Sequence, residues 1–261
     1  AGNEYASGDK LGLMLPGLQE ELLEAVTAVG KPVVLTVLAG SALDLSWAQE
    51  HAGVPAILEC WYPGARGGMA IAEALFGEFS PCGKLPVTFY EGTEFLPDFT
   101  DYSMAGRTYR YTDAHILYPF GYGLTYSQIH YSDAGVDKTD SDMAEDVTVR
   151  VNVENRGSYP VHETVQVYVR YKERKAYDPG YQLKGIRSVA LECGEKKAVS
   201  ITLNPRDFAL ISEDGKCLVH PGDYEIAVGG QQPDARSSSL TGQTVSRLLV
   251  RKMGNIMEVE Y

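Results

Sequence analysis

Few side chains in this sequence have the types and spacing that catalysis or metal binding requires. The five histidines are scattered without metal-ligand spacing, and the four cysteines contain no CxxC pair. Ser41 follows an apolar run, but the full Gly-x-Ser-x-Gly nucleophile motif is absent. The glycines at 64, 67 and 68 match neither a dinucleotide fingerprint nor a phosphate loop. We therefore expect no metal and no cofactor. The residues concerned are His51, His115, His130, His162, His220, Cys60, Cys82, Cys193 and Cys217.

Arginines alternate with tyrosines in one stretch, where Arg107 and Arg110 lie among Tyr102, Tyr109 and Tyr111. This pattern predicts guanidinium groups placed over aromatic rings. Two readings stay open, a carbohydrate-contacting surface and a clamp between domains. We favour the clamp, because a long ordered connection needs packing of its own.

The elements that must position such residues centre on the stretch from Val54 to Tyr90. Val54 to Cys60 predicts a buried strand, and Tyr62-Pro63-Gly64 predicts a sharp turn after it. A helix over 69–76 follows, with Ile71, Ala74 and Leu75 on one apolar face, and 85–89 predicts a returning strand. Strand, helix and strand in this order are the unit of a largely parallel sheet covered by helices.

Residues before Val54 continue the same alternation. Leu15-Pro16-Gly17 opens a predicted helix that extends to about Val29, and PVVLTVLAG after Lys31 predicts a strand buried on both faces. A short amphipathic segment covers 43–51. On the helix, Leu18, Leu22, Ala25 and Val29 lie near one face. We expect an α/β layer whose ligand edge lies at the carboxyl ends of its strands.

The second half of the chain has a different periodicity. An acidic linker is expected over 133–146, and the segments after it alternate apolar and polar residues between turns. Such strands have one face in a core, so their succession predicts an antiparallel sandwich. The segment VSRLLVRKMGNIMEV is compatible with a strand or a terminal helix. We place the domains at 1–92 (α/β), 93–132 (ordered aromatic connection), 133–240 (β-sandwich) and 241–261 (tail).

Composition limits the partners. The chain has 261 residues and a formal net charge of −12, which argues against nucleic acid or an anionic membrane and fits a neutral ligand. No apolar run approaches the roughly 20 residues of a membrane span. Free thiols and the absence of a signal segment lead us to expect a cytoplasmic location.

Several motifs in a fixed order carry a family resemblance. PGARGGMAIAEALFGEFSPCGKLPVTF, then RTYRY and LYPFGYGLTYS, resemble the C-terminal half of glycoside hydrolase family 3, the β-glucosidases and β-xylosidases. VENRG, ETVQVYV, QLKGIRSVAL, NPRDFAL and PGDYEIAVGG are similar to the fibronectin type III-like domain that ends many of those enzymes. The resemblance implies a partial α/β sandwich, a mostly parallel sheet with helices, followed by a fibronectin type III-like antiparallel β-sandwich.

The resemblance also implies where the catalytic groups lie. Family members begin with a (β/α)8 barrel that carries the aspartate nucleophile, and this chain has no match to that motif. Their acid/base glutamate precedes a Gly-Asp-Arg or Gly-Asp-Lys sequence, here Gly8-Asp9-Lys10, and the matching position falls just before Ala1. Retaining cleavage needs two carboxyl groups about 5 Å apart. Glu4 is the nearest carboxylate that this chain offers as a substitute acid/base, against the ordinary reading of a solvated glutamate.

We therefore expect the C-terminal portion or subunit of a retaining β-glycosidase that hydrolyses terminal non-reducing β-D-glucosyl or β-D-xylosyl residues. Another polypeptide, or another part of the same enzyme, would supply the barrel and the first sandwich strands, and the isolated chain would be inactive. Without those strands a sheet edge and two apolar helix faces are left open, and such an edge invites pairing with another chain. The alternative is a non-catalytic scaffold or carbohydrate-binding protein.

Overall fold

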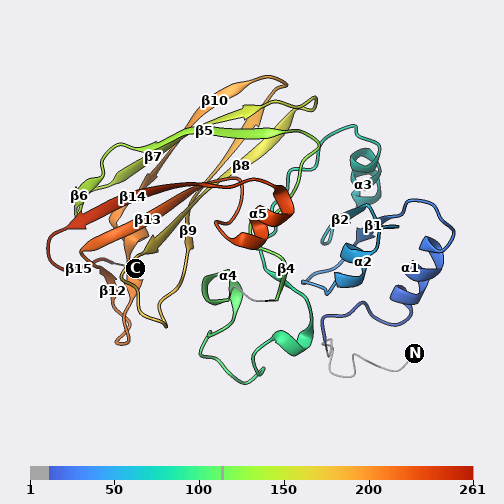
Figure 1. The fold of residues 1–261 in the computed structure, drawn as a ribbon, viewed down its shortest axis with the longest axis horizontal. Coiled ribbons are helices and arrows are strands. Elements are labelled where there is room, and N and C mark those ends of the chain that lie inside the picture. Colours follow the sequence, from blue (N-terminus) through green and yellow to red (C-terminus); the bar gives the residue numbers. More distant parts are fainter. Residues whose placement is uncertain (1–11, 113–114, 261) are drawn as a thin grey trace.

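The computed structural model describes residues 12–112 and 115–260. Figure 1 shows an α/β part at one end of the molecule and a β-sandwich at the other, with an aromatic-rich connection beneath the line where they meet. The confirmed fold class is thus a mixed α/β region followed by a β-rich domain. No helix within these described ranges combines the length and the apolar character needed to cross a membrane.

The α/β part is built around two parallel strands. β1 and β2 pair in parallel, with Val34 opposite Ala56 and Val37 opposite Glu59. Leu23 of α1, Ala48 of α2 and Val54 form a small buried cluster beside these strands. The elements are α1 (Gln19–Thr27), β1 (Val34–Val37), α2 (Ser46–Glu50), β2 (Ala56–Glu59), α3 (Gly67–Leu75), β3 (Phe89–Tyr90), η1 (Thr93–Phe95), α4 (Thr108–Tyr111) and β4 (Ile116–Tyr118).

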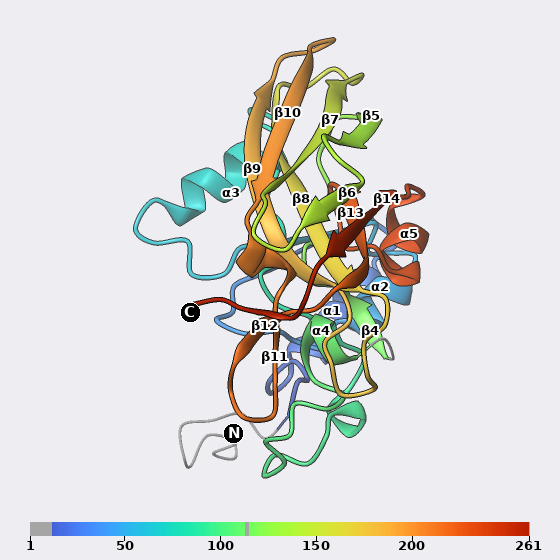
Figure 2. The same ribbon diagram turned by 90° about the vertical axis from the view of Figure 1, so that its left-hand side faces the viewer.

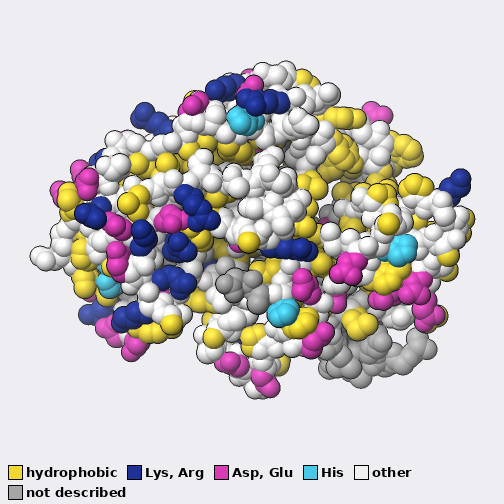
Figure 3. Space-filling model, in the orientation of Figure 1, with side chains coloured by type: hydrophobic (Ala, Val, Ile, Leu, Met, Phe, Trp, Pro, Cys, Tyr) yellow, Lys and Arg dark blue, Asp and Glu magenta, His cyan; other side chains and the backbone are white. Residues whose placement is uncertain are grey.

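One expectation for this part needs correction, and one is met. The strand predicted over 85–89 is only Phe89–Tyr90, and it pairs antiparallel with β4 instead of joining the β1–β2 sheet. Pro86 has no N–H to donate to a neighbouring strand. The backbone before it is bonded to the aromatic connection instead, because the Leu85 N–H donates to the Tyr122 carbonyl. As expected of an open helix face, the predicted apolar face is exposed at Leu22 of α1 and at Leu18 and Val29, which flank the helix, while Leu23 is buried. Figure 3 also shows hydrophobic side chains at the surface over α3.

The β-sandwich has two sheets, whose strand orders are β10-β7-β5 and β6-β14-β13-β8-β9. Alternation puts the valines of β7 inside, so that Val147, Val149, Val151 and Val153 are buried in one core with residues of the facing sheet. The remaining elements are β5 (Ile129–Val136), β6 (Asp140–Asp142), β7 (Val147–Asn155), β8 (Val161–Tyr171), β9 (Gln182–Leu191), β10 (Lys196–Leu203), η2 (Pro205–Phe208), β11 (Leu210–Ile211), β12 (Cys217–Val219), β13 (Gly222–Gly229), α5 (Ala235–Thr241), β14 (Ser246–Met253) and β15 (Met257–Glu258). In Figure 2, α3 projects to the left of the sandwich strands.

One segment of this half differs from the sequence reading, and a second, left open there, is decided. The expected acidic linker over 133–146 contains the end of β5 and the strand β6, because its backbone pairs with β7 and β14 while most of its carboxylates face solvent. The segment left open as a strand or a helix contains β14, which pairs antiparallel with β13.

Buried polar groups join the two parts. Lys84 Nζ donates to the Gly123 carbonyl at 2.8 Å and lies 3.6 Å from Glu163 Oε1 on β8. Gln166 donates to the Gly121 and Gly230 carbonyls, both at 3.0 Å. A Cβ on Gly123 would lie 2.1 Å from the Gly83 carbonyl oxygen, so the close backbone approach requires glycine there. The Tyr-Pro-Phe-Gly-Tyr-Gly motif is therefore the joint between the parts.

Candidate functional site

A large concavity lies along β1 and beyond its carboxyl end. Its volume is about 1560 Å³. One part of its wall comes from α1 and β1 and is mostly apolar; the other part comes from the residues that follow β1, from the turn after β2, and from the connection. Among the lining residues are Leu22, Val26, Leu35, Val37, Leu38, Gly40, Ser41, Tyr62, Thr93, Phe99 and Arg107. The concavity thus lies at the carboxyl end of β1, the edge of the α/β layer where a ligand was expected.

The turn after β2 projects an aromatic ring over this edge. Glu59 Oε1 accepts the Trp61 N–H at 2.9 Å, and Trp61 has a φ of 50°, a conformation rarely adopted by a bulky residue. Tyr62 is 81% exposed, and a Cβ on Gly40 would lie 2.5 Å from its Cε2 atom. The ring of Tyr62 therefore rests on the glycine that follows β1.

Another part of the wall of the concavity is a loop held by an arginine. The Arg107 guanidinium donates to the carbonyls of Pro97, Asp98 and Asp101. Hydrogen bonds from Thr100 lower the pKa of Asp98, and hydrogen bonds from Ser103 lower the pKa of Asp101. These two carboxylates stay ionised and suit turn formation better than proton donation.

The sequence expectation for the two arginines is half right. Arg110 lies over the Tyr109 ring at 5.7 Å, as predicted, whereas Arg107 binds backbone carbonyls. Tyr109 itself stacks on Phe120 at 4.1 Å and accepts the Leu183 N–H of the sandwich at 3.1 Å. These contacts are those of a clamp between domains.

Gly12 and Leu13, the first residues that the structure describes, lie at the concavity. Leu13 donates its N–H to Thr93 Oγ1 at 2.8 Å, and its carbonyl accepts the Asp44 N–H at 2.8 Å. Gly12 and Leu13 both line the concavity. Glu4, the proposed acid/base, lies outside the described residues.

Glu59 is a residue that the sequence reading missed. Burial raises the pKa of its carboxyl, partly offset by the Trp61 N–H, and its Oε2 atom is buried without a hydrogen-bond partner among the described residues. Burial, followed by the Glu59 charge, also raises the pKa of the neighbouring Cys60 thiol. Its place at the carboxyl end of a predicted strand was the only available signal.

The Glu59 charge should cost stability at neutral pH. Because folding raises its pKa above 4.5, the folded chain binds more protons than the unfolded chain just above that pH, and stability falls as the pH rises through the raised pKa. Glu59→Gln keeps an acceptor for Trp61 and removes the charge. We expect it to increase the free energy of unfolding by about 1 kcal/mol at pH 7, measured in urea, and to lose this advantage below pH 4.5. An equal difference at both pH values would contradict the assignment.

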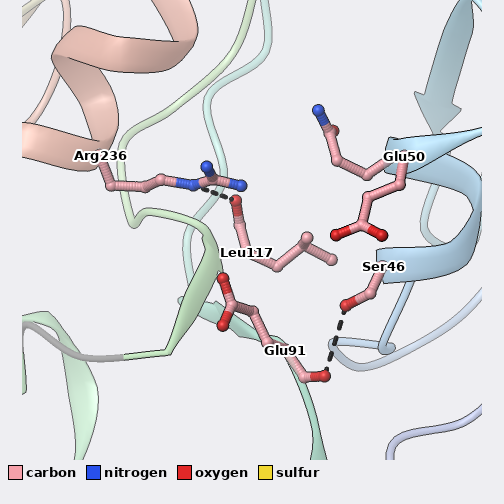
Figure 4. A pocket seen from close by; sticks show the side chains of 6 residues that line it. Ser46, Glu50, Glu91, Leu117 and Arg236 are labelled. Carbon is pink, nitrogen blue, oxygen red and sulfur yellow. Dashed lines mark hydrogen bonds between the residues drawn. The ribbon is translucent and has the colours of Figure 1, made fainter.

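A second pocket, of about 340 Å³, lies between α2, β4 and α5. Figure 4 shows the carboxylates of Glu50 and Glu91 and the guanidinium of Arg236 directed toward the same space. Arg236 Nε donates to the Leu117 carbonyl at 3.1 Å, and Ser46 Oγ donates to the Glu91 carbonyl at 3.3 Å. Because α5 belongs to the sandwich and the other walls to the first half, this pocket is part of the contact between them.

The other sequence candidates do not assemble into a site. Within the described ranges, no group of three or more His, Cys, Asp or Glu side chains could hold a metal ion. The four cysteines are free. Ser41 lines the concavity, but among the described residues no histidine forms a hydrogen bond with its hydroxyl.

Comparisons with known proteins give two domain matches. Residues 1–126 match the glycosyl hydrolase family 3 C-terminal domain, and residues 163–232 match the fibronectin type III-like domain.

Several relatives match nearly all of this chain. It is 37% identical over 242 residues to the xylan 1,4-beta-xylosidase of Xylanibacter ruminicola, covering 91% of this chain and 27% of that protein. It is 31% identical to the periplasmic beta-glucosidase of Salmonella typhimurium, covering 87% and 31%. The beta-glucosidase from Listeria innocua, solved in complex with glucose, superposes with a TM-score of 0.81 at 27% identity, covering 98% and 36%. The chain thus spans between 27% and 36% of these relatives.

Proposed function

Because this chain consists of a glycosyl hydrolase family 3 C-terminal domain and a fibronectin type III-like domain, related to β-xylosidases and β-glucosidases, we propose that it is the C-terminal portion of a retaining β-glycosidase. The enzyme removes terminal non-reducing β-D-glucosyl or β-D-xylosyl residues. The observation that carries this proposal is the match to both enzyme classes over about nine-tenths of the chain. This chain completes a sugar site whose barrel lies outside it.

The proposed division of the chemistry follows from the two carboxyl groups of retaining cleavage. One carboxylate attacks the anomeric carbon, and the second group protonates the departing oxygen, at a separation of about 5 Å. The nucleophile belongs to the barrel. Glu4 is the acid/base in this proposal, because it is the carboxylate nearest in sequence to the position that the family resemblance implies. Asp98 and Asp101, with lowered pKa values, suit a proton donor poorly.

The proposed partner also covers an open edge. In the described part of the chain β1 pairs with β2 alone, so the other edge of β1 has free backbone groups. The apolar side chains of α1 beside it, Leu18, Leu22, Val26 and Val29, are exposed. A strand with apolar residues on both faces fits this edge, since it would satisfy the backbone groups and cover the helix. We assign it to the same polypeptide region that carries the barrel.

Reconstitution tests the proposal. The chain is co-expressed with a segment that carries a family 3 barrel and the first sandwich strands, and the purified sample is assayed with a chromogenic β-glucoside and a β-xyloside. We expect a stable complex that hydrolyses at least one substrate, with neither component active alone. A complex that binds sugar without turnover would contradict the enzyme assignment and support a carbohydrate-binding scaffold. The ratio of the two rates assigns the sugar.

We propose a cytoplasmic location, on the support of four free cysteines. Cell fractionation followed by thiol labelling is the test. Recovery of the chain in an oxidising compartment, with its thiols paired, would contradict this location.

A further inference from the structure

We propose that the acidic turn over 141–145, together with the ring of Phe208, is a binding site for a primary ammonium ion, and that the chain fills this site with its own Lys252. This inference is independent of the proposed function. Lys252 is 1% exposed and lies on the inward face of β14, the face that carries the core residue Val250. A charge at such a place is costly unless polar groups surround it.

Three oxygen atoms surround the Lys252 nitrogen. Nζ donates to Ser141 Oγ at 3.0 Å, to the Asp142 carbonyl at 3.1 Å and to the Glu145 carbonyl at 2.6 Å. Because an ammonium group has three N–H donors and no acceptor, each donor has one oxygen. A neutral amine has one donor fewer, and its lone pair would face an oxygen lone pair. The oxygen set therefore favours the charged form.

The remaining wall of the site is aromatic. Lys252 Nζ lies 4.5 Å from the centre of the Phe208 ring, which is itself 1% exposed. A desolvated cation over the face of an aromatic ring is attracted by the ring quadrupole. Hard metal ions are bound by oxygen ligands alone. Oxygens on one side and a ring on the other thus suit an organic ammonium ion better than a metal ion.

The turn holds these oxygens through hydrogen bonds of its own. The Glu145 N–H donates to the Asp142 carbonyl at 3.2 Å, and the Asp142 N–H donates to Glu145 Oε2 at 3.0 Å. Ser141 Oγ donates to the Asp142 carbonyl at 3.1 Å, which leaves its lone pairs for the cation. Because none of these bonds involves Lys252, we expect the site to persist when that side chain is removed.

Charges around the site also favour a cation. Burial lowers the pKa of the Lys252 amine, whereas the carboxylates of Glu145, Asp146 and Asp142 act in the opposite direction. Lys138 adds to the lowering of this pKa, but its own charge is paired with Glu145 at 3.4 Å. The acidic stretch before β7 therefore supplies both the oxygen ligands and the negative potential of the site.

Removal and replacement of the side chain test the site. Lys252→Ala removes the atoms of one propylammonium ion and leaves the turn in place. We expect the thermal midpoint of the chain to fall by about 10 °C, and propylammonium chloride to recover about half of this fall or more, with saturation. Tetramethylammonium chloride, which has no N–H donor, and 1-propanol, which has no charge, should recover little. Lys138→Ala, in a lysine that is partly exposed on the same turn, should respond equally to both salts.

Equal recovery of Lys252→Ala by propylammonium and 1-propanol would overturn the proposal, because filling of the cavity would then explain the effect. Equal recovery by the two salts, no recovery, or an unchanged midpoint in the variant would also overturn it.

If Lys252→Ala does not fold, a double-mutant cycle decides in its place. Ser141→Ala should lower the midpoint about twice as much in the wild-type chain as in Lys252→Met, which keeps the length of the side chain without its charge. Equal losses in the two backgrounds would contradict an ammonium site at Ser141.

Discussion

Replacing Lys84 with methionine should lower the free energy of unfolding by about 3–5 kcal/mol, because it leaves a carboxylate buried without its cation. The Lys84 and Glu163 side chains are 13% and 3% exposed, and their charged atoms lie 3.6 Å apart. Glu163 Oε1 also accepts the Tyr131 hydroxyl at 2.8 Å. Burial, followed by the Glu163 charge, raises the pKa of Tyr131, so this hydroxyl stays protonated and remains a donor. One neutral donor cannot replace the lost ammonium group.

Urea unfolding at pH 7 measures this effect, with an exposed ion pair as the matched control. Lys196 lies 3.4 Å from Asp133, with exposures of 47% and 67%, and Lys196→Met should cost less than about 1 kcal/mol. Adding Glu163→Gln to Lys84→Met should recover part of the loss, because the buried charge is removed. If Lys84→Met and Lys196→Met were equally mild, Glu163 would have to be hydrated, contrary to its burial.

In the reconstituted complex, Glu4→Gln should lower kcat/KM for methyl β-glucoside by about 10²–10⁴-fold. Methoxide is a poor leaving group, so its departure needs a proton from a general acid. A dinitrophenyl β-glucoside has a leaving group that departs without protonation, so formation of the glycosyl-enzyme should be nearly unaffected by the same substitution. The diagnostic result is therefore a loss that depends on the leaving group.

Steady-state and burst kinetics on both substrates measure the difference. Glu21→Gln, an exposed carboxyl on α1, is the control and should leave both rates unchanged. An equal effect of Glu4→Gln on both substrates, or no effect on either, would remove Glu4 from the proposed role. The acid would then belong to residues outside this chain.

Much of the fold follows from local pattern. α1, α3, β1 and β2 lie within a few residues of the predicted segments, because helical and strand periodicities are strong there. Local pattern failed where tertiary pairing decided. The backbone of Ile129–Val136 forms a strand because β7 lies beside it. Of the strand predicted over 85–89, only the end is paired, where Phe89–Tyr90 meets β4. The uncovered apolar face of α1 was predicted as well, from the strands that the family resemblance implies and this chain lacks.

The candidate site was less accessible to sequence reasoning. The dipeptide Trp61–Tyr62 reads as the end of a strand, and nothing in it shows that one ring turns inward and the other rests on Gly40, over twenty residues away in sequence. The buried oxygen of Glu59 likewise depends on its surroundings. The placement of the ligand edge at the carboxyl ends of the strands was predictable, since it follows from strand direction alone.

The joint between the two parts also bears on how this chain could be recombined with others. Fibronectin-like domains often serve as exchangeable units on a linker. Here an exchange would separate Glu163 from Lys84, Gln166 from the Gly121 carbonyl, and Arg236 from the Leu117 carbonyl. A chimera would therefore have to carry the connection and its glycines along with the sandwich. In this chain the sandwich and its connection must therefore be engineered as one unit.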